Sequence, residues 1–101
     1  MRRDIKILSP KYLDFIRSKP CLVSHSHIGG TDAHHVIARG WRNSKQMDLS
    51  CLPLCRSAHV EIEQIGVEKF SDKYDVNIWR ELFWLLVEFA VSQGWVKTKE
   101  K

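Results

Sequence analysis

The sequence predicts an α+β domain in which a short β-hairpin is flanked by an N-terminal helix and a long C-terminal helix. Its 101 residues suffice for one hydrophobic core and are too few for a Rossmann domain or a TIM barrel. Hydrophobic residues make up 44% of the chain and charged residues 28%, a globular composition. Two short β-like segments lie among segments with helical periodicity. We expect a single domain over residues 1–101.

The first predicted helix begins at Ser9-Pro10. Ser9 can cap the helix, and Pro10 falls in the first turn. Backbone N–H groups in the first turn have no partner within the helix, so the N–H that proline lacks costs no hydrogen bond there. Lys19-Pro20 ends the helix, because the residue before proline disfavours helical geometry. The stretch that follows, as far as Asp32, is turn-like and contains a glycine pair.

The hairpin is predicted from residues 33–38 and 51–54. Val36 and Ile37 favour a strand in the first segment. Pro53 restricts the second segment to an edge strand or the end of a strand, since proline cannot donate to a sheet. A polar loop over residues 39–50 connects the two.

Three further helices are predicted over residues 56–65, 67–74 and 78–93. Gly66 ends the first of them, Asn77 caps the last and Gly94 closes it. The last helix is apolar nearly all round. We therefore expect it to form the main wall of the core, with half of a dimer interface as the alternative.

The charge distribution is compatible with a polyanionic partner. The formal net charge is +4, and residues 1–20 alone carry six Lys and Arg against two Asp, a local +4. A solvated basic surface is the alternative explanation.

The most apolar stretch, residues 78–91, contains three charged residues, and the N-terminus lacks the apolar core of a signal peptide. Three cysteines are an odd number, which disfavours a disulfide framework. We expect a cytoplasmic protein that has no membrane segment.

Two histidine arrangements are candidates for chemistry. His34 and His35 are adjacent near the end of a predicted strand, where one imidazole can face a metal and the other a water molecule or a phosphate. His59 and Glu63 are four residues apart on a predicted helix, so they share a face and can bind one divalent cation. Taken singly, each arrangement is also explained by ordinary polar residues.

The sequence resembles a known family in four places. These are residues 32–36 (DAHHV), Asp48, residues 52–59 (LPLCRSAH) and residues 65–70 (IGVEKF). They are similar to the HNH endonucleases, and more narrowly to the small phage and prophage HNH proteins related to the recombination-enhancing nuclease of temperate phages. The resemblance covers residues 19–93. It implies a ββα-metal finger over about residues 21–66, in which two antiparallel strands and a helix surround one divalent ion, with helical support over residues 67–95.

The resemblance also implies roles for individual residues. His34 and His59 match metal ligands, and Glu63 stands where many relatives carry a further histidine ligand. His35 matches the general base, and Asp48 matches a residue that orients the base or supports the loop. The implied reaction is hydrolysis of DNA phosphodiester bonds with one divalent ion, Mg²⁺, Mn²⁺, Ni²⁺ or Zn²⁺. Two imidazoles and a carboxylate suit the last three better than Mg²⁺.

Phosphate and base contacts are expected from the polar inter-strand loop. The candidates are Arg39, Trp41, Arg42 and Lys45. A solvated loop with one packed tryptophan is the alternative.

A structural zinc ion found in many relatives is not expected here. Cys21 and Cys55 are retained, but their partner positions hold Ser24 and Ala58. An alternative tetrahedral set remains open, formed by Cys21, His25 or His27, Cys51 and Cys55. Small apolar packing is the other explanation for these cysteines.

The expected partners are DNA and a recombination or replication protein, and the oligomeric state is open. A second hypothesis is a catalytically inactive nucleic-acid-binding module of the same fold that acts with a partner protein. A third is a protein-interaction module that uses Trp79, Phe83 and Trp84 of the last helix.

Overall fold

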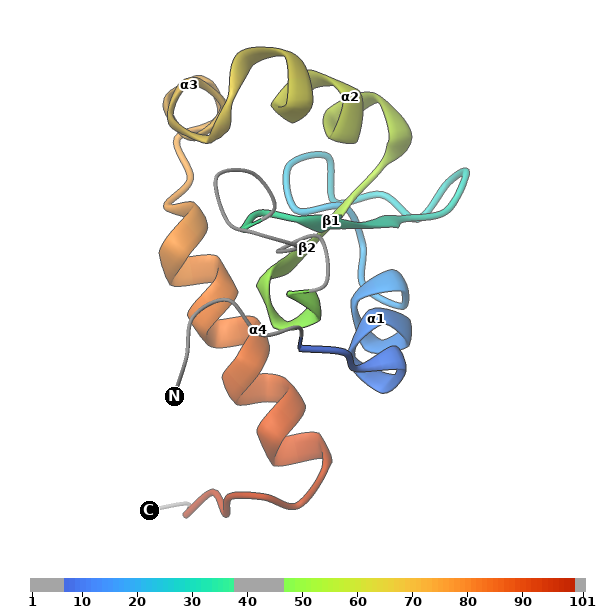
Figure 1. The fold of residues 1–101 in the computed structure, drawn as a ribbon, viewed down its shortest axis with the longest axis vertical. Helices are drawn as coiled ribbons and strands as arrows, with labels where there is room; N and C mark the ends of the chain where they lie inside the picture. Colours follow the sequence, from blue (N-terminus) through green and yellow to red (C-terminus); the bar gives the residue numbers. More distant parts are fainter. Residues whose placement is uncertain (1–6, 38–46, 100–101) are drawn as a thin grey trace.

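The computed structural model describes residues 7–37 and 47–99. Within them it has four α-helices, a two-stranded antiparallel sheet and a 3-10 turn, which make a small compact α+β domain (Figure 1). In chain order these are α1 (Pro10–Arg17), β1 (Asp32–His35), η2 (Asp48–Ser50), β2 (Cys51–Leu54), α2 (Arg56–Ile65), α3 (Val67–Tyr74) and α4 (Ile78–Ser92).

The helix ends follow the capping residues. The Ser9 hydroxyl accepts a hydrogen bond from the Tyr12 N–H at 3.2 Å, and the Asn77 side chain accepts one from the Arg80 N–H at 3.1 Å. Gly66 separates α2 from α3 with φ +89°, a left-handed conformation that glycine adopts without strain. The predictions for these helices are therefore confirmed to within two residues.

Strand β1 differs from its predicted position. The sequence predicted a strand over residues 33–38, whereas β1 is Asp32–His35. The reason lies in the pairing: His35 pairs with Cys51, the first residue of β2, and Asp32 pairs with Leu54, the last. Beyond His35 the chain faces the turn η2, and the Val36 N–H bonds the Ser50 carbonyl. The predicted position of β2 is confirmed. Because the sheet has only two strands, both are edge strands, and this agrees with the restriction that Pro53 places on β2.

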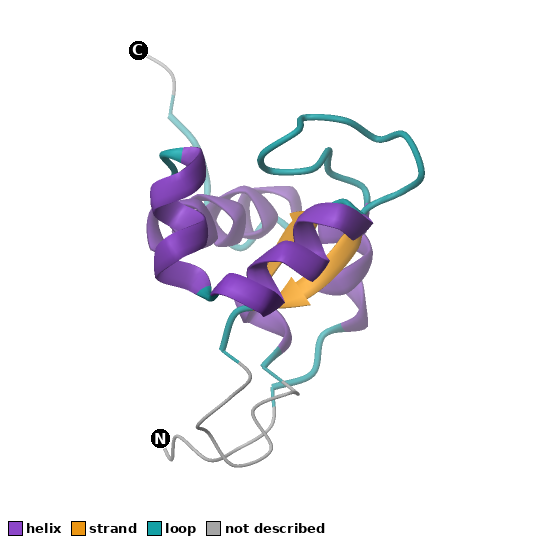
Figure 2. Cartoon of the chain, turned by 90° about the horizontal axis from the view of Figure 1, so that it is seen from above, coloured by secondary structure: helices purple, strands orange, loops and turns teal. Residues whose placement is uncertain are grey.

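The sheet separates two clusters of buried side chains. Leu52 and Leu54 of β2 face a cluster shared with α2, α3 and the first half of α4. Cys51 belongs to a second cluster with Tyr12, Ile16 and Phe89, which joins α1 to the second half of α4. Side chains alternate along a strand, so β2 can serve both clusters. Figure 2 shows α2 lying across the strand pair, with α1 and α4 behind it.

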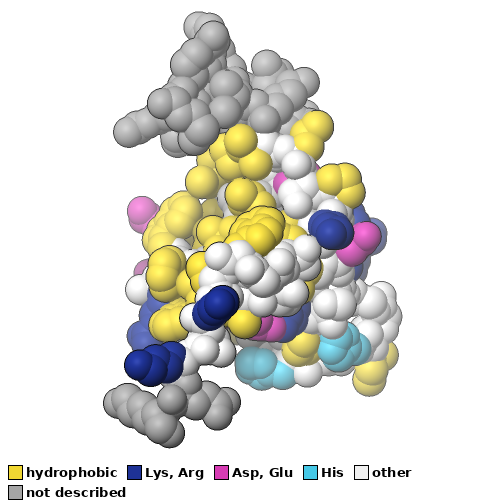
Figure 3. Space-filling view, turned by 90° about the horizontal axis from the view of Figure 1, so that it is seen from below, with side chains coloured by type: hydrophobic (Ala, Val, Ile, Leu, Met, Phe, Trp, Pro, Cys, Tyr) yellow, Lys and Arg dark blue, Asp and Glu magenta, His cyan; other side chains and the backbone are white. Residues whose placement is uncertain are grey.

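Helix α4 buries one face and exposes the other. Ile78, Leu82 and Phe89 point into the core and are at most 6% exposed. The prediction that this helix forms a wall of the core therefore holds for this face. Trp79, Phe83 and Trp84 lie outside the core and are 57%, 58% and 55% exposed. Both buried clusters contact the same side of this 15-residue helix, so the residues on its other side stay exposed. Figure 3 shows hydrophobic side chains at the surface on the side where α4 lies.

No helix in the described ranges combines the length and the apolar character needed to cross a lipid bilayer.

Candidate functional site

Strand β1 and helix α2 bring three candidate ligands together. Asp32 and His34 lie two residues apart on β1 and share the face that α2 covers, where they meet His59. The ring centroids of His34 and His59 are 4.8 Å apart. One donor atom from each of His34, His59 and Glu63 lies within 4.8 Å of the other two, and His59 Nε2 is 3.7 Å from Glu63 Oε1. Two imidazole nitrogens and a carboxylate oxygen at this separation fit a single divalent ion.

Asp32 orients His59, a role that the sequence analysis missed. Its Oδ2 atom lies 2.9 Å from His59 Nδ1, which leaves His59 Nε2 facing Glu63. Arg56 donates to the same carboxylate from Nε at 2.9 Å and from Nη2 at 3.4 Å. The hydrogen bonds from His59 and Arg56 lower the pKa of Asp32. The alternation that places Asp32 on the same strand face as His34 could have identified it.

Removing this carboxylate is expected to weaken metal binding without unfolding the chain. Carboxylates that hold a ligating histidine typically contribute about 10–100-fold to metal affinity. We therefore expect Asp32→Ala to lower Mn²⁺ or Zn²⁺ affinity by that factor in a calorimetric titration. Asp14→Ala is the matched control, because Asp14 is an exposed carboxylate on α1 that pairs only with Arg17 among the described residues. Equal affinities for the two variants would contradict the role of Asp32.

His34 is held in its neutral form. Burial lowers its pKa to about 4, aided by the charges of His59 and His35 and opposed by that of Glu63. A neutral imidazole has a free lone pair, which is the state that binds a metal.

The pKa of His34 predicts a pH dependence of stability. In the unfolded chain histidine has a pKa of about 6.5. Between pH 6.5 and about pH 4 the unfolded chain therefore binds more protons at this position than the folded chain. The free energy of unfolding without metal is expected to fall as the pH drops through that range, as measured by urea denaturation. His34→Gln should flatten this decline, and an unchanged slope in that variant would contradict the assignment.

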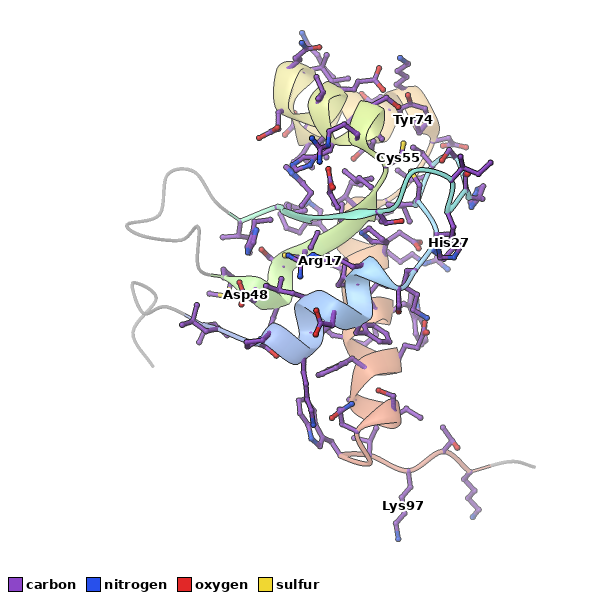
Figure 4. All side chains as sticks on the ribbon, turned by 90° about the vertical axis from the view of Figure 1, so that its right-hand side faces the viewer. Arg17, His27, Asp48, Cys55, Tyr74 and Lys97 are labelled. Carbon is purple, nitrogen blue, oxygen red and sulfur yellow. The ribbon has the colours of Figure 1, made fainter. Side chains whose placement is uncertain are left out.

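His35 makes its contacts on the other side of β1. Its Nε2 atom lies 2.9 Å from Asp48 Oδ1, and the second oxygen of Asp48 accepts the Ser9 N–H at 2.7 Å. Asp48 is only 5% exposed. A carboxylate accepts hydrogen bonds, so His35 carries a proton on Nε2, and in the neutral imidazole Nδ1 is then the nitrogen with the free lone pair. In Figure 4 Asp48 lies at the turn η2, just before β2, and Cys55 lies beyond the other end of that strand. The contact with Ser9 had no counterpart in the sequence analysis.

The alternative zinc set is not assembled. Of the residues that the structure describes, only His34, His59 and Glu63 form a group of three or more potential ligands within 4.8 Å. Neither His25 nor His27 forms such a group with Cys21, Cys51 and Cys55, and Cys51 packs in the cluster of Tyr12, Ile16 and Phe89. Burial, with the charge of Asp48, raises the pKa of Cys51 to about 12.

Cys21 and Cys55 do lie near one another. The Ser24 hydroxyl donates to Cys55 Sγ at 4.0 Å. Burial alone would raise the pKa of Cys21, but hydrogen bonds from the backbone of Cys55 and from Ser24 lower it to about 7. Two thiols and a hydroxyl thus occupy this corner of the fold.

The four predicted nucleic-acid contacts, Arg39, Trp41, Arg42 and Lys45, lie outside the described residues.

Comparison with known proteins gives two matches. Residues 2–94 match the model of a family described as "Protein of unknown function (DUF968)". The chain is also similar to the Escherichia coli (strain K12) protein described as "Uncharacterized protein YdfU", with 33% identity over 86 residues. That alignment covers 83% of this chain and 23% of the relative, so the chain spans about a quarter of the relative's length. No solved structure matches.

Proposed function

The chain belongs to the family described as "Protein of unknown function (DUF968)", and from the site that it carries we propose that it is a metal-dependent DNA endonuclease of the HNH type. The hairpin β1–β2 and helix α2 would then be a ββα-metal finger, with α1, α3 and α4 as its support.

One observation carries this proposal. A histidine held by a buried carboxylate, His35 with Asp48, immediately follows His34 of the candidate ligand group His34, His59 and Glu63. A module that only binds nucleic acid has no use for an oriented base that follows a metal ligand directly in the chain. A hydrolase needs both, because it must activate water and stabilise charge on a phosphate.

The candidate ligands would hold Mg²⁺, Mn²⁺, Ni²⁺ or Zn²⁺. When bound, such an ion supplies Lewis-acid stabilisation of the negative charge that develops on the phosphate and the leaving oxygen. Asp32 fixes His59 in the tautomer whose Nε2 is the ligand.

His35 accepts the proton of the attacking water at Nδ1, and Asp48 stabilises the imidazolium that forms. The water oxygen forms a bond to phosphorus while the bond from phosphorus to the 3′-oxygen breaks. The leaving 3′-oxygen takes a proton from solvent water, and the products are a 5′-phosphate and a 3′-hydroxyl.

Among the residues that the structure describes, Arg56 is a basic residue whose side chain can contact the substrate. Its side chain is 80% exposed at the first position of α2, and Asp32 holds its guanidinium beside the candidate ligands. The charge on this group and the N-terminus of α2 both favour a phosphate at this position.

The test is cleavage of supercoiled plasmid DNA by the purified chain in the presence of each of the four metals. We expect nicked or linear product with at least one metal, none with EDTA, and nicks that DNA ligase can seal. Absence of cleavage with every metal, together with retained DNA binding in EDTA, would favour the inactive binding module. Absence of both activities would contradict both hypotheses.

A further inference from the structure

We propose that the outward face of α4 binds the same face of a second copy of this chain, with the two helices antiparallel. Trp79, Phe83 and Trp84 are each more than half exposed on this face, and the rings of Phe83 and Trp84 stack edge to face with centroids 5.4 Å apart. An exposed aromatic cluster of this kind marks an interaction site on a soluble domain.

The spacing on this face is that of a helix-packing seam. Phe83, Val87 and Ala90 follow one another at intervals of four and three residues, and Val91 lies beside them. The small Ala90 lets a second helix approach closely. Arg80 is the charged residue nearest the middle of this face. Glu88 lies one turn after Trp84 at the edge of the face, where it pairs with Lys19, and Glu81 is only partly exposed.

The charge of Arg80 favours a second copy in the antiparallel orientation. Residue 80 precedes the centre of the seam, Val87, by as many residues as Gly94 follows it. In an antiparallel pair centred on Val87, Arg80 therefore lies against the C-terminal turn of the partner helix. That turn contains no basic residue of its own, so its carbonyl groups favour a cation. In a parallel pair the two Arg80 side chains would repel one another.

The exposed area is sufficient for the centre of a dimer interface. The three aromatic side chains leave roughly 400 Å² accessible per copy, since each can bury about 150–250 Å² in full. Pairing two such faces, with the flanking residues, reaches the lower range of specific interfaces, about 1,200 Å² in total. Standard dimers place aromatic residues at such centres.

The face that would pair is separate from the candidate functional site. His34, His35 and Asp48 come from β1 and η2, and His59 and Glu63 from α2, so none of them lies on α4. A dimer formed through α4 would carry two complete sites. This inference therefore does not depend on the proposed nuclease activity.

The experiment is sedimentation equilibrium of the full chain from micromolar to submillimolar concentrations. The chain has a mass of 11.8 kDa, and we expect the wild type to approach twice that mass. Phe83→Glu should remain at the monomer mass. Val60→Glu is the control, because Val60 is an exposed apolar residue on another helix, 44% exposed on α2, and this variant should stay dimeric. Circular dichroism establishes that each variant is folded.

A cysteine substitution tests the orientation of the two helices. It also keeps the proposal testable if the Phe83→Glu variant does not fold. In an antiparallel pair Val87→Cys lies near the two-fold axis, so it should form a disulfide-linked dimer under mild oxidation, whereas Val60→Cys should not. A monomeric wild type over the whole concentration range would overturn the proposal. So would a dimer that survives Phe83→Glu, a larger assembly, or equal cross-linking of the two cysteine variants.

Discussion

Replacing His35 with alanine is expected to reduce DNA cleavage by about 10²–10⁴-fold, the usual contribution of a positioned general base. His35 presents a free Nδ1 because Asp48 occupies Nε2, and alanine removes the proton acceptor. His34, His59 and Glu63 stay in place, so metal affinity and DNA binding should change little. Plasmid nicking, metal titration and DNA binding in EDTA, measured on the same preparation, separate these effects.

The control for this variant is His27→Ala. His27 is an exposed histidine in the loop before β1, and its replacement should leave cleavage unchanged. His35→Ala also leaves one oxygen of the buried Asp48 without its partner, which costs about 1–3 kcal/mol of stability. Cleavage assays at temperatures well below the melting temperature of the variant keep it folded, so this loss of stability does not affect the measured cleavage rate. Wild-type cleavage rates in the His35→Ala protein would rule out His35 as the base.

Replacing His59 with alanine is expected to have the largest effect on metal binding. His59 is the central member of the ligand group, since it contacts Glu63 on one side, Asp32 on the other, and packs against His34. Its loss should lower Mn²⁺ or Zn²⁺ affinity by more than about 100-fold, beyond the range for a carboxylate that only orients a ligand. Cleavage should disappear with it.

Metal-induced thermal stabilisation provides an independent measurement. A ligand that binds only the folded chain raises its stability, so saturating Zn²⁺ should raise the melting temperature of the wild type and not that of His59→Ala. His27→Ala should behave as the wild type does. If His59→Ala retained the metal-induced shift, the ion would bind elsewhere, and the assignment of His34, His59 and Glu63 as ligands would be wrong.

Local chemistry made most helix and strand positions predictable. Ser9, Gly66 and Asn77 act through contacts within a few residues, and such contacts are visible in a sequence. The extent of β1 was less predictable, because it depends on where β2 begins to pair with it. Val36 and Ile37 have strand propensity, but Val36 bonds to the turn η2 instead.

The candidate site was predictable where spacing determines proximity, as for His59 and Glu63 on one helix face. The contact between His35 and Asp48 was predicted only through the family resemblance. Asp32 and Ser9 were missed because their roles depend on which strand face meets α2 and on where α1 begins in space. Likewise, the apolar sequence of α4 does not reveal which of its faces the core uses.

The bond from the Ser9 N–H to Asp48 joins residues 39 positions apart, and it makes the first helix part of the apparatus that aims His35. Helix α1 is anchored by the packing of Tyr12 against Phe89, with ring centroids 4.9 Å apart. The backbone holds the same junction a second time, because the Asp48 N–H donates to the Ile7 carbonyl at 2.9 Å. The orientation of His35 therefore depends on the segment that begins α1 as well as on the hairpin that carries the histidine.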